Sequence, residues 1–237
     1  MIRVVDDIRA THLDYPNLVL TIGSFDGVHR GHHAILDAVV RRARAINGTP
    51  AVLTIRPHPR EFFSPDHAPS LLTHSAKKLE LFEAAGIDAM IFLRFNADVA
   101  TLEPEDFVRE IIVERCRAKA VAVGHDFRFG KNARGDFELL ASLAPQHGFE
   151  VEQVPALLMD GERVSSTLIR ERLLLGDLVK AEAFLGRPYS LVGKVVPGRR
   201  IGTTIGFPTA NIKPHHSAIP AQGVYVCEAK VGGKHYP

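Results

Sequence analysis

Two histidines three residues apart carry the clearest chemistry in this sequence. His29 and His32 flank Gly31 in the stretch GSFDGVHRGH, directly after an apolar run from Leu18 to Gly23. A strand that gives way to a helix here would place both imidazoles beside the free N–H groups and the positive dipole of a helix start, where phosphate binds well. Imidazoles can donate hydrogen bonds to phosphate oxygens and offset charge that develops in nucleotidyl transfer. The pattern therefore predicts a triphosphate site.

Zinc binding and histidines without a role are the alternatives. His33 could join the pair as a third zinc ligand, but no Asp, Glu or Cys stands at a convincing ligand spacing. The spacing alone also leaves open that the histidines are ordinary surface residues. Other phosphate motifs fit poorly, because Gly124–Asn132 is one residue too long for a Walker A loop and ends in Asn, and no GxGxxG is present.

Two polar stretches follow the second and fourth strand-like runs. RPHPR, residues Arg56–Arg60, sets His58 between two prolines, which stiffen the backbone, and two arginines. The stretch Gly124–Asp136 mixes residue types that suit a ring system beside a phosphate, namely Asp126, Phe127, Arg128, Phe129 and Lys131. Both stretches are expected at the same rim of the sheet as the histidines.

A third polar stretch, Ser165–Leu173, begins a predicted helix. Ser165 or Ser166 is a natural N-cap. Arg170 falls one turn after Ser166, so hydroxyls, backbone N–H groups and a guanidinium could meet one phosphate. Each stretch has an ordinary interpretation by itself, but their occurrence at successive strand ends favours one shared site.

The elements that position these residues alternate between strand and helix. Near-continuous apolar strands with helices between them are typical of a parallel sheet covered on both faces, so we predict an α/β fold. The predicted strands are Leu18–Gly23, Ala51–Ile55, Ala89–Phe95, Ala120–Gly124 and, more weakly, Phe149–Pro155. The predicted helices between them are His32–Ile46, Ser75–Ala85, Pro104–Cys116 and Asp136–His147.

The pattern changes after Asp160. Two short helices are predicted, Ser166–Leu175 and Leu178–Leu185, and the Gly-x-Pro of LGRPYS then ends helical structure. The remaining sequence is β-like, with SLVGKVV and GVYVCEAKV separated by Gly and Pro. We therefore expect two domains, residues 1–186 and residues 187–237.

Composition sets broad limits on the class of protein. The 237 residues carry a net charge of +2, which gives no indication of nucleic-acid binding. The two cysteines are too few for a disulfide framework, and Cys116 is expected to be buried and reduced. No apolar run is long enough to span a bilayer, and the N-terminus lacks the apolar core of a signal peptide. A cytoplasmic enzyme without a membrane partner is expected, and its oligomeric state stays open.

The motifs together resemble a known family. GSFDGVHRGH is similar to the HxGH signature of the nucleotidyltransferase superfamily. With RPHPR, VGHDFRFGKNARGD, VSSTLIRERLLLGD and LGRPYSLVGKVVPGRRIGTTIGFPTANI, in this order, the chain resembles the bacterial bifunctional riboflavin kinase/FMN adenylyltransferase family, also called FAD synthetase. The resemblance implies a Rossmann-like domain that joins FMN and ATP into FAD and pyrophosphate. It also implies a small β-barrel that phosphorylates riboflavin with ATP and Mg²⁺.

The resemblance also implies roles for residues. His29, Gly31 and His32 would hold the ATP phosphates, and Arg170 would meet them from the other side. The further implied ATP-binding residues are Gly23, Ser24, Phe25, Asp26, Ser165, Ser166 and Thr167. The implied flavin-binding residues are His58, Pro59, Phe62, Asp126, Phe127 and Phe129. In the barrel, Thr209 and Asn211 would bind magnesium, and the loop over the nucleotide would contain Gly198, Gly202 and Gly206.

Two departures from the family pattern stand out. Many relatives have Phe-x-Pro-His-Pro where this chain has Ile55 to Pro59, a mild change. The glutamate expected to act as the base in riboflavin phosphorylation would lie beyond Pro237, so we expect the kinase half of this chain to be incomplete. The rival interpretations are another HxGH adenylyl- or cytidylyltransferase, and a flavin- or nucleotide-binding module without catalysis.

Overall fold

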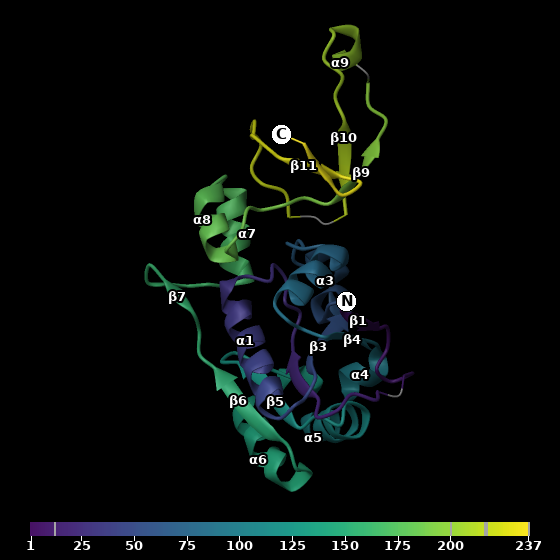
Figure 1. Ribbon diagram of the computed structural model, residues 1–237, viewed down its shortest axis with the longest axis vertical. Coiled ribbons are helices and arrows are strands. Elements are labelled where there is room, and N and C mark those ends of the chain that lie inside the picture. The colour runs from purple at the N-terminus through teal and green to yellow at the C-terminus, as the bar shows by residue number, and fades with distance from the viewer. Residues whose placement is uncertain (12, 200, 216–217, 237) are drawn as a thin grey trace.

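A six-stranded sheet in which every neighbouring pair is parallel forms the centre of the protein, in the order β1-β4-β3-β2-β5-β6 (Figure 1). The computed structural model describes residues 1–11, 13–199, 201–215 and 218–236. The strands are β1 (Arg3–Val5), β2 (Val19–Ile22), β3 (Pro50–Arg56), β4 (Ala89–Arg94), β5 (Ala120–Gly124) and β6 (Glu150–Val154). The predicted α/β fold with a parallel sheet is confirmed, and only the short edge strand β1 was not predicted.

Helices cover both faces of this sheet, because successive strand residues point to opposite sides. On one side, α1 (Arg30–Ala45) and α3 (Ser75–Ala84) pack over Val19, Val52 and Met90. On the other, a π-helix, η2 (Val108–Arg115), and α6 (Phe137–His147) pack over Leu20 and Leu53. The central strands are therefore buried on both faces, which explains their nearly continuous apolar sequence, with Thr21 and Thr54 as buried polar exceptions.

The edge strand β6 has a different pattern because its surface is partly exposed. Glu150 and Glu152 alternate along it and form ion pairs with Arg42 and Arg41 of α1. Charged side chains on an edge strand hinder pairing with other chains.

Short helical elements connect the strands and long helices of the sheet region. They are α2 (Pro59–Phe63), η1 (Pro65–His67), α4 (Ala97–Thr101), α5 (Pro104–Phe107) and η3 (Lys131–Ala133). The single helix predicted over Pro104–Cys116 is instead α5 followed by the π-helix η2. Cys116 ends it and is buried as expected, and burial raises the pKa of its thiol to about 12.

A smaller apolar cluster lies beyond β6. The hairpin of β7 (Leu158–Met159) and β8 (Glu162–Arg163) leads into α7 (Ser166–Leu174) and α8 (Leu178–Leu185). Both helices match their predicted ranges closely. They share a core formed by Ile169, Leu173, Ala181 and Phe184. Gly186 ends α8 in a left-handed conformation, with φ at 76°, a region that glycine adopts readily.

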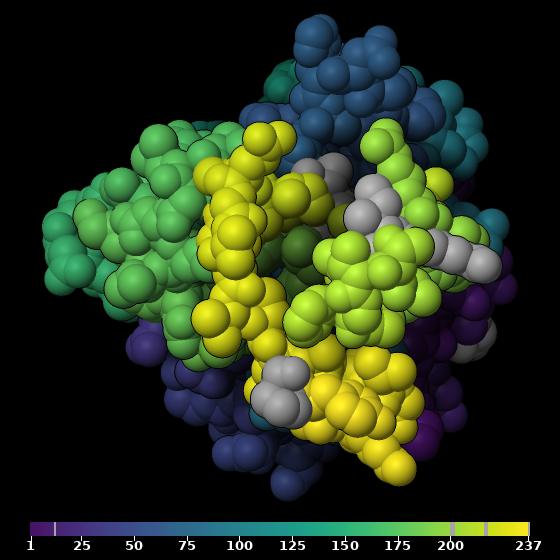
Figure 2. Space-filling model, turned by 90° about the horizontal axis from the view of Figure 1, so that it is seen from above, coloured from purple at the N-terminus to yellow at the C-terminus, as the bar shows by residue number. Residues whose placement is uncertain are grey.

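The segment from residue 187 onward, called the C-terminal segment below, forms two separate antiparallel pairs. They are β9 (Gly193–Val196) with β10 (Asn211–Pro214), and β11 (Ala229–Val231) with β12 (Lys234–Tyr236). A short helix, α9 (Ile201–Thr204), lies between β9 and β10. The described residues of this segment form no closed barrel, and only the end of the β-like run GVYVCEAKV is a strand. Figure 2 shows the yellow C-terminal stretch beside α7 and α8, with an open hollow between it and the β9–β10 pair.

The strand order determines where a ligand can enter. From β2 the chain builds β3 and β4 on one side of the sheet and then returns to place β5 on the other side of β2. In open α/β sheets, ligands bind beyond the carboxyl ends of the strands at such a reversal. Within the described residues, no helix is both long and apolar enough to cross a membrane.

Candidate active site

A cavity of about 1010 Å³ opens at the carboxyl ends of the strands, at the reversal point of the sheet. The loops after β2, β3, β5 and β6, together with α7, line it. This volume lies at the upper end of the usual range for small-molecule sites. It suits a reaction that brings two sizeable substrates together.

His29 and His32 cap the helix α1 reciprocally at one wall of this cavity. The backbone N–H of His32 donates to Nδ1 of His29 at 3.2 Å, and the backbone N–H of His29 donates to Nδ1 of His32 at 3.4 Å. The two rings stack with centroids 3.5 Å apart. A capping box normally pairs Ser or Thr with Glu or Gln. In this protein two imidazole rings make the same two hydrogen bonds to the backbone.

This capping fixes the protonation state of both rings. Each Nδ1 accepts a hydrogen bond, so we assign the ring proton to Nε2, which is the nitrogen left to donate. Burial lowers the pKa of His29 to about 4, with the charge of Arg187 as the next cause, and burial holds the pKa of His32 well below its ordinary value. Both imidazoles are therefore neutral Nε2–H donors at neutral pH.

Two glycines allow this packing. A Cβ on Gly31 would lie 3.2 Å from the His29 ring and 3.4 Å from the carbonyl oxygen of Val164. A Cβ on Gly23 would lie 3.0 Å from the Phe25 ring, which itself packs against the His32 ring with centroids 4.9 Å apart. Side chains at either position would push the histidines from their places.

The loop between β2 and α1 is strained. Phe25, Gly27 and Val28 all have positive φ, at 49°, 92° and 41°. For Val28, a β-branched residue, this region is a genuine outlier that costs about 1–3 kcal/mol. Such a backbone conformation persists only where neighbouring contacts hold it. It places His29 at the wall of the cavity.

Asp26 is the anchor of this loop. Its buried carboxylate accepts hydrogen bonds from the backbone N–H groups of Leu72 and Thr73 at 3.0 and 3.1 Å. It also pairs with the Arg170 guanidinium at 2.6 Å, while the Ser166 hydroxyl donates to its backbone carbonyl at 2.7 Å. The helix α7 is thereby fixed to the loop that carries the histidines.

Arg170 is held on two sides. Besides its pair with Asp26, its Nε donates to the carbonyl of Ser70 at 2.6 Å. Arg170 thus joins α7 to the loop before α3 as well as lining the cavity. Ser165 serves as the N-cap of α7, since its hydroxyl accepts from the N–H of Leu168 at 3.2 Å.

The structure brings most of the expected site residues of the first 186 residues to this one cavity. Those that line it are Gly23, Ser24, Phe25, Asp26, His29, Gly31, His32, His58, Pro59, Asp126, Phe127, Ser165, Ser166, Thr167 and Arg170. Phe62 and Phe129 are not among the lining residues. The expected residues of the C-terminal segment lie elsewhere.

Phe129 and Phe62 pack against other aromatic rings. Phe129 is buried and stacks on Phe127 at 5.3 Å, so it supports a lining residue from behind. Phe62, on α2, meets Phe95 edge-on at 5.4 Å outside the cavity. Phe62 would have to move to contact a flavin in the cavity. Phe129 would act on the flavin only through Phe127.

Lys78 is a cavity residue that the sequence did not single out. Its Nζ donates to the carbonyl of Ser24 at 2.7 Å, and burial lowers the pKa of its ammonium group. The adjacent Lys77 instead pairs with Glu80 at 2.9 Å. The sequence shows two adjacent lysines on a helix, and it does not show which of them faces the cavity.

Two family models match successive parts of the chain. The family model for FAD synthetase matches residues 12–168, and the model for riboflavin kinase matches residues 185–237. The bifunctional riboflavin kinase/FMN adenylyltransferase of Escherichia coli K12 is 40% identical over 210 residues, which cover 89% of this chain and 67% of that protein. The chain belongs to this family. The family member from Pseudomonas fluorescens is 36% identical over 237 residues, which cover all of this chain and 75% of that protein.

A solved structure has the same architecture as this family member. A protein described as a macrolide-efflux protein from Streptococcus pneumoniae aligns over 98% of this chain and 76% of its own, with a TM-score of 0.85 and 26% identity. The alignment includes the C-terminal segment as well as the sheet. Both family models assign this chain to FAD biosynthesis, with a FAD synthetase region and a riboflavin kinase region.

The residues expected in the riboflavin kinase region form two close pairs. A Cβ on Gly198 would overlap the amide of Asn211, and a Cβ on Gly202 would lie 3.1 Å from the Thr209 hydroxyl. The predicted loop glycines thus lie directly against the predicted magnesium ligands. Gly206 has φ at 82° and no neighbour within 4 Å. The loop contains the short helix α9 rather than irregular structure alone.

Proposed function

We propose that residues 1–186 transfer AMP from ATP to FMN in the cavity at the sheet reversal. An oxygen of the FMN phosphate attacks the α-phosphorus of ATP, the bond from that phosphorus to the bridging oxygen breaks, and pyrophosphate leaves. The FMN phosphate is already a nucleophile, so the protein needs no covalent intermediate. Its contribution is positioning and stabilisation of charge.

The observation that carries this proposal is the reciprocal capping of His29 and His32. Because each Nδ1 is occupied by a backbone N–H, both Nε2–H groups are prepared as donors before a ligand arrives. Preorganised donors need no reorganisation while charge develops on the leaving pyrophosphate. Lys78 and Arg170 add positive charge to the same cavity.

The remaining lining residues divide between the two substrates. We propose that Gly23–Asp26, with Ser165, Ser166 and Thr167, contact the ATP, because they belong to the loop and helix beside the histidines. His58, Pro59, Asp126 and Phe127 line the cavity from the loops after β3 and β5, and we propose that they contact the flavin. Phe129 would support Phe127 from behind.

We further propose a magnesium site in the C-terminal segment, which we assign to the riboflavin kinase domain of residues 187–237. Thr209 and Asn211 offer hard oxygen donors of the kind Mg²⁺ prefers. Gly198 and Gly202 let the loop backbone approach these two side chains more closely than a residue with a Cβ could. Bound magnesium would neutralise phosphate charge. The residues Gly198, Gly202 and Gly206 would let the backbone of the loop approach the nucleotide closely.

One assay tests the adenylyl-transfer proposal. The protein is incubated with ATP and either FMN or another phosphorylated acceptor, and pyrophosphate and the adenylylated product are measured. FAD and pyrophosphate in equal amounts, with FMN only, are expected. Transfer to another acceptor would identify a different nucleotidyltransferase, and FMN or ATP binding without pyrophosphate would identify a binding module.

A further inference from the structure

Arg187 reaches from the C-terminal segment into the loop that carries the histidines. It follows Gly186, the residue that ends α8. Its Nη2 donates to the carbonyl of Gly27 at 2.5 Å, and its Nη1 donates to the carbonyl of Val28 at 2.9 Å. The two partners lie about 160 residues earlier in the chain, directly before His29.

The two acceptors form the part of the loop that leads directly into His29, and one of them, Val28, is strained. Gly27 and Val28 both have positive φ, and Val28 is completely buried. Backbone of this kind persists only where neighbouring structure holds it. A guanidinium presents donors in a rigid planar fork, which suits two successive carbonyls better than a single ammonium would.

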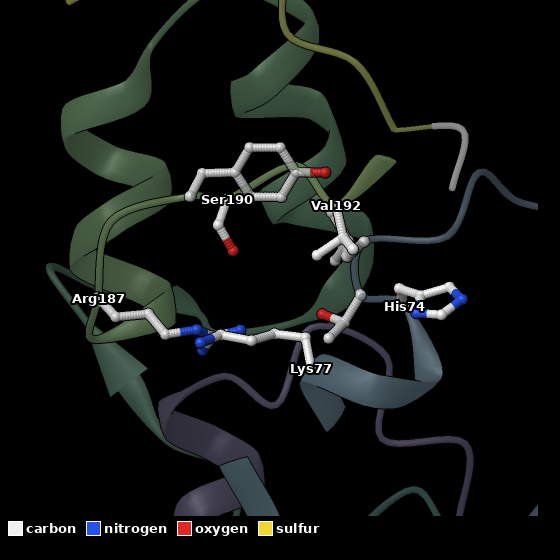
Figure 3. A pocket seen from close by; sticks show the side chains of 8 residues that line it. His74, Lys77, Arg187, Ser190 and Val192 are labelled. Carbon is white, nitrogen blue, oxygen red and sulfur yellow. The ribbon is translucent and has the colours of Figure 1, made fainter. Parts of the chain in front are cut away.

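Gly186 lies close to the other side of His29. A Cβ added at Gly186 would lie only 3.2 Å from Cγ and 3.3 Å from Nε of Arg30, the first residue of α1. Arg187 therefore bonds to the residue before His29, while Gly186 leaves space beside the side chain of the residue after it. Figure 3 shows Arg187 crossing a small pocket that Thr73, His74 and Tyr189 also line.

We propose that Arg187 is a positioning residue for adenylyl transfer, holding the Gly27–Val28 backbone, which is strained at Val28, so that His29 and His32 stay capped and aimed at the triphosphate. The inference rests on the proposed role of the two histidines. It means that a residue on the riboflavin kinase side of the chain belongs to the machinery of the other reaction. The charge of Arg187 also helps to keep His29 neutral.

The test compares Arg187→Ala and Arg187→Lys with the wild type and with Arg44→Ala, which removes an exposed arginine in the last turn of α1. FAD formation is measured for kcat and for the KM of ATP and FMN, at a temperature where circular dichroism shows each variant folded. Guanidinium chloride at non-denaturing millimolar concentration, against sodium chloride, tests rescue of Arg187→Ala. Amide hydrogen exchange at His32 and His33 is followed in parallel.

Arg187→Ala is expected to lower kcat about tenfold to a hundredfold, the size of effect that misplaced catalytic groups produce. The KM for FMN should change far less, guanidinium should restore part of kcat, and the His32 amide should exchange faster. Arg187→Lys should be intermediate and Arg44→Ala normal. Unchanged kcat and exchange in folded Arg187→Ala, or a loss without guanidinium rescue, would overturn the proposal. If the wild type makes no FAD, the proposed function fails, and the exchange measurement alone decides whether Arg187 orders the loop.

Discussion

At the scale of single residues, the site depends on side chains that are already engaged with the backbone. His29 and His32 each give one ring nitrogen to a capping bond and retain the other for a ligand. Asp26 uses both carboxylate oxygens on the loop before α3 and on Arg170. These contacts remove rotamer freedom before substrate binds, so less entropy is lost on binding.

Replacing His32 with Ala is expected to reduce FAD formation at least about tenfold to a hundredfold, because one preorganised donor to developing charge is lost. The fold should survive, as judged by circular dichroism. His33→Ala is the matched control, because His33 is adjacent but does not line the cavity. Equal loss in both variants would instead favour a metal site that uses His33, and near-normal turnover of His32→Ala would refute the phosphate role.

The pKa of His29 gives a prediction for stability. The folded protein binds its proton with a pKa of about 4, against 6.5 ordinarily, so between these values the unfolded chain binds more protons. The free energy of unfolding should therefore rise as the pH increases from about 4 to 6.5, by up to about 3 kcal/mol from this group. Urea unfolding at several pH values should show a shallower rise for His29→Gln. An identical slope in both proteins would contradict the assignment of a buried neutral imidazole.

At the scale of elements, α7 is fixed to two loops by Arg170. The planar guanidinium donates from Nε to Ser70 and from Nη2 to Asp26, at 2.6 Å each. The loop around Asp26 and the loop around Ser70 contain no helix or strand at these residues. The positions of both loops therefore depend on side-chain contacts such as those of Arg170.

Arg170→Lys should therefore impair ATP-dependent FAD formation although the charge is kept, because an ammonium cannot reproduce the fork between two fixed acceptors. A loss of about tenfold or more in kcat/KM for ATP is expected. Arg172→Lys is the control, since Arg172 lies on the same helix and pairs with Glu162 at 2.7 Å away from the cavity. Equal kinetics for Arg170→Lys and the wild type would show that the guanidinium geometry is not required.

Elements with a strong local pattern could be predicted from the sequence, and those decided by distant contacts could not. The strands β2 to β5 are mostly apolar because both their faces are covered, and this shows in the residues themselves. The strand β1 has three residues and an exposed Val4, so only its pairing with β4 reveals it. The split of Pro104–Cys116 into α5 and a π-helix likewise depends on packing.

The candidate site follows the same rule. The histidines, Ser165–Thr167 and the loops after β3 and β5 could be found because chemistry-bearing residues follow predicted strands. Lys78 and Arg187 could not, because their partners, Ser24 and Gly27–Val28, are 54 and about 160 residues away. The expected flavin contacts could not be predicted in detail either, because the sequence does not show that Phe62 packs against Phe95.

At the scale of the whole molecule, the C-terminal segment lies beyond one end of the sheet region (Figure 1), and specific hydrogen bonds join the two. The N–H of Ala218 donates to the carbonyl of Leu71. Within the segment, the hydroxyl of Tyr189 donates to the carbonyl of the same Ala218 at 2.6 Å and so helps to hold it in place. Leu71 directly precedes the residues that hold Asp26. The segment thus contacts the loop before α3 as well as the loop before α1.

Tyr189→Phe removes the internal bond that holds Ala218, and through it should weaken the contact of Ala218 with Leu71 by about 1 kcal/mol. Amide exchange at Ala218 and His215 should become faster, as mass spectrometry or NMR can measure. Tyr225→Phe is the control, because its hydroxyl bonds to the carbonyl of Ala221, whose N–H donates to Leu173 and not to Leu71, so the Ala218 amide should be unchanged. Unaltered exchange in Tyr189→Phe would mean that apolar packing alone holds the segment.

The reciprocal cap at the start of α1 also constrains how such a site can change during evolution. A residue that replaces His29 or His32 must accept a hydrogen bond from the backbone of α1 and donate one to a phosphate. Both bonds must come from the same side chain. Aspartate could meet only the first demand, and lysine or arginine only the second. Asparagine and glutamine carry an acceptor and donors on one amide, so they are the substitutions expected to preserve most of both roles. A lineage that replaced the imidazoles by any other residue would have to find a new cap for its first long helix as well as a new donor to the phosphates.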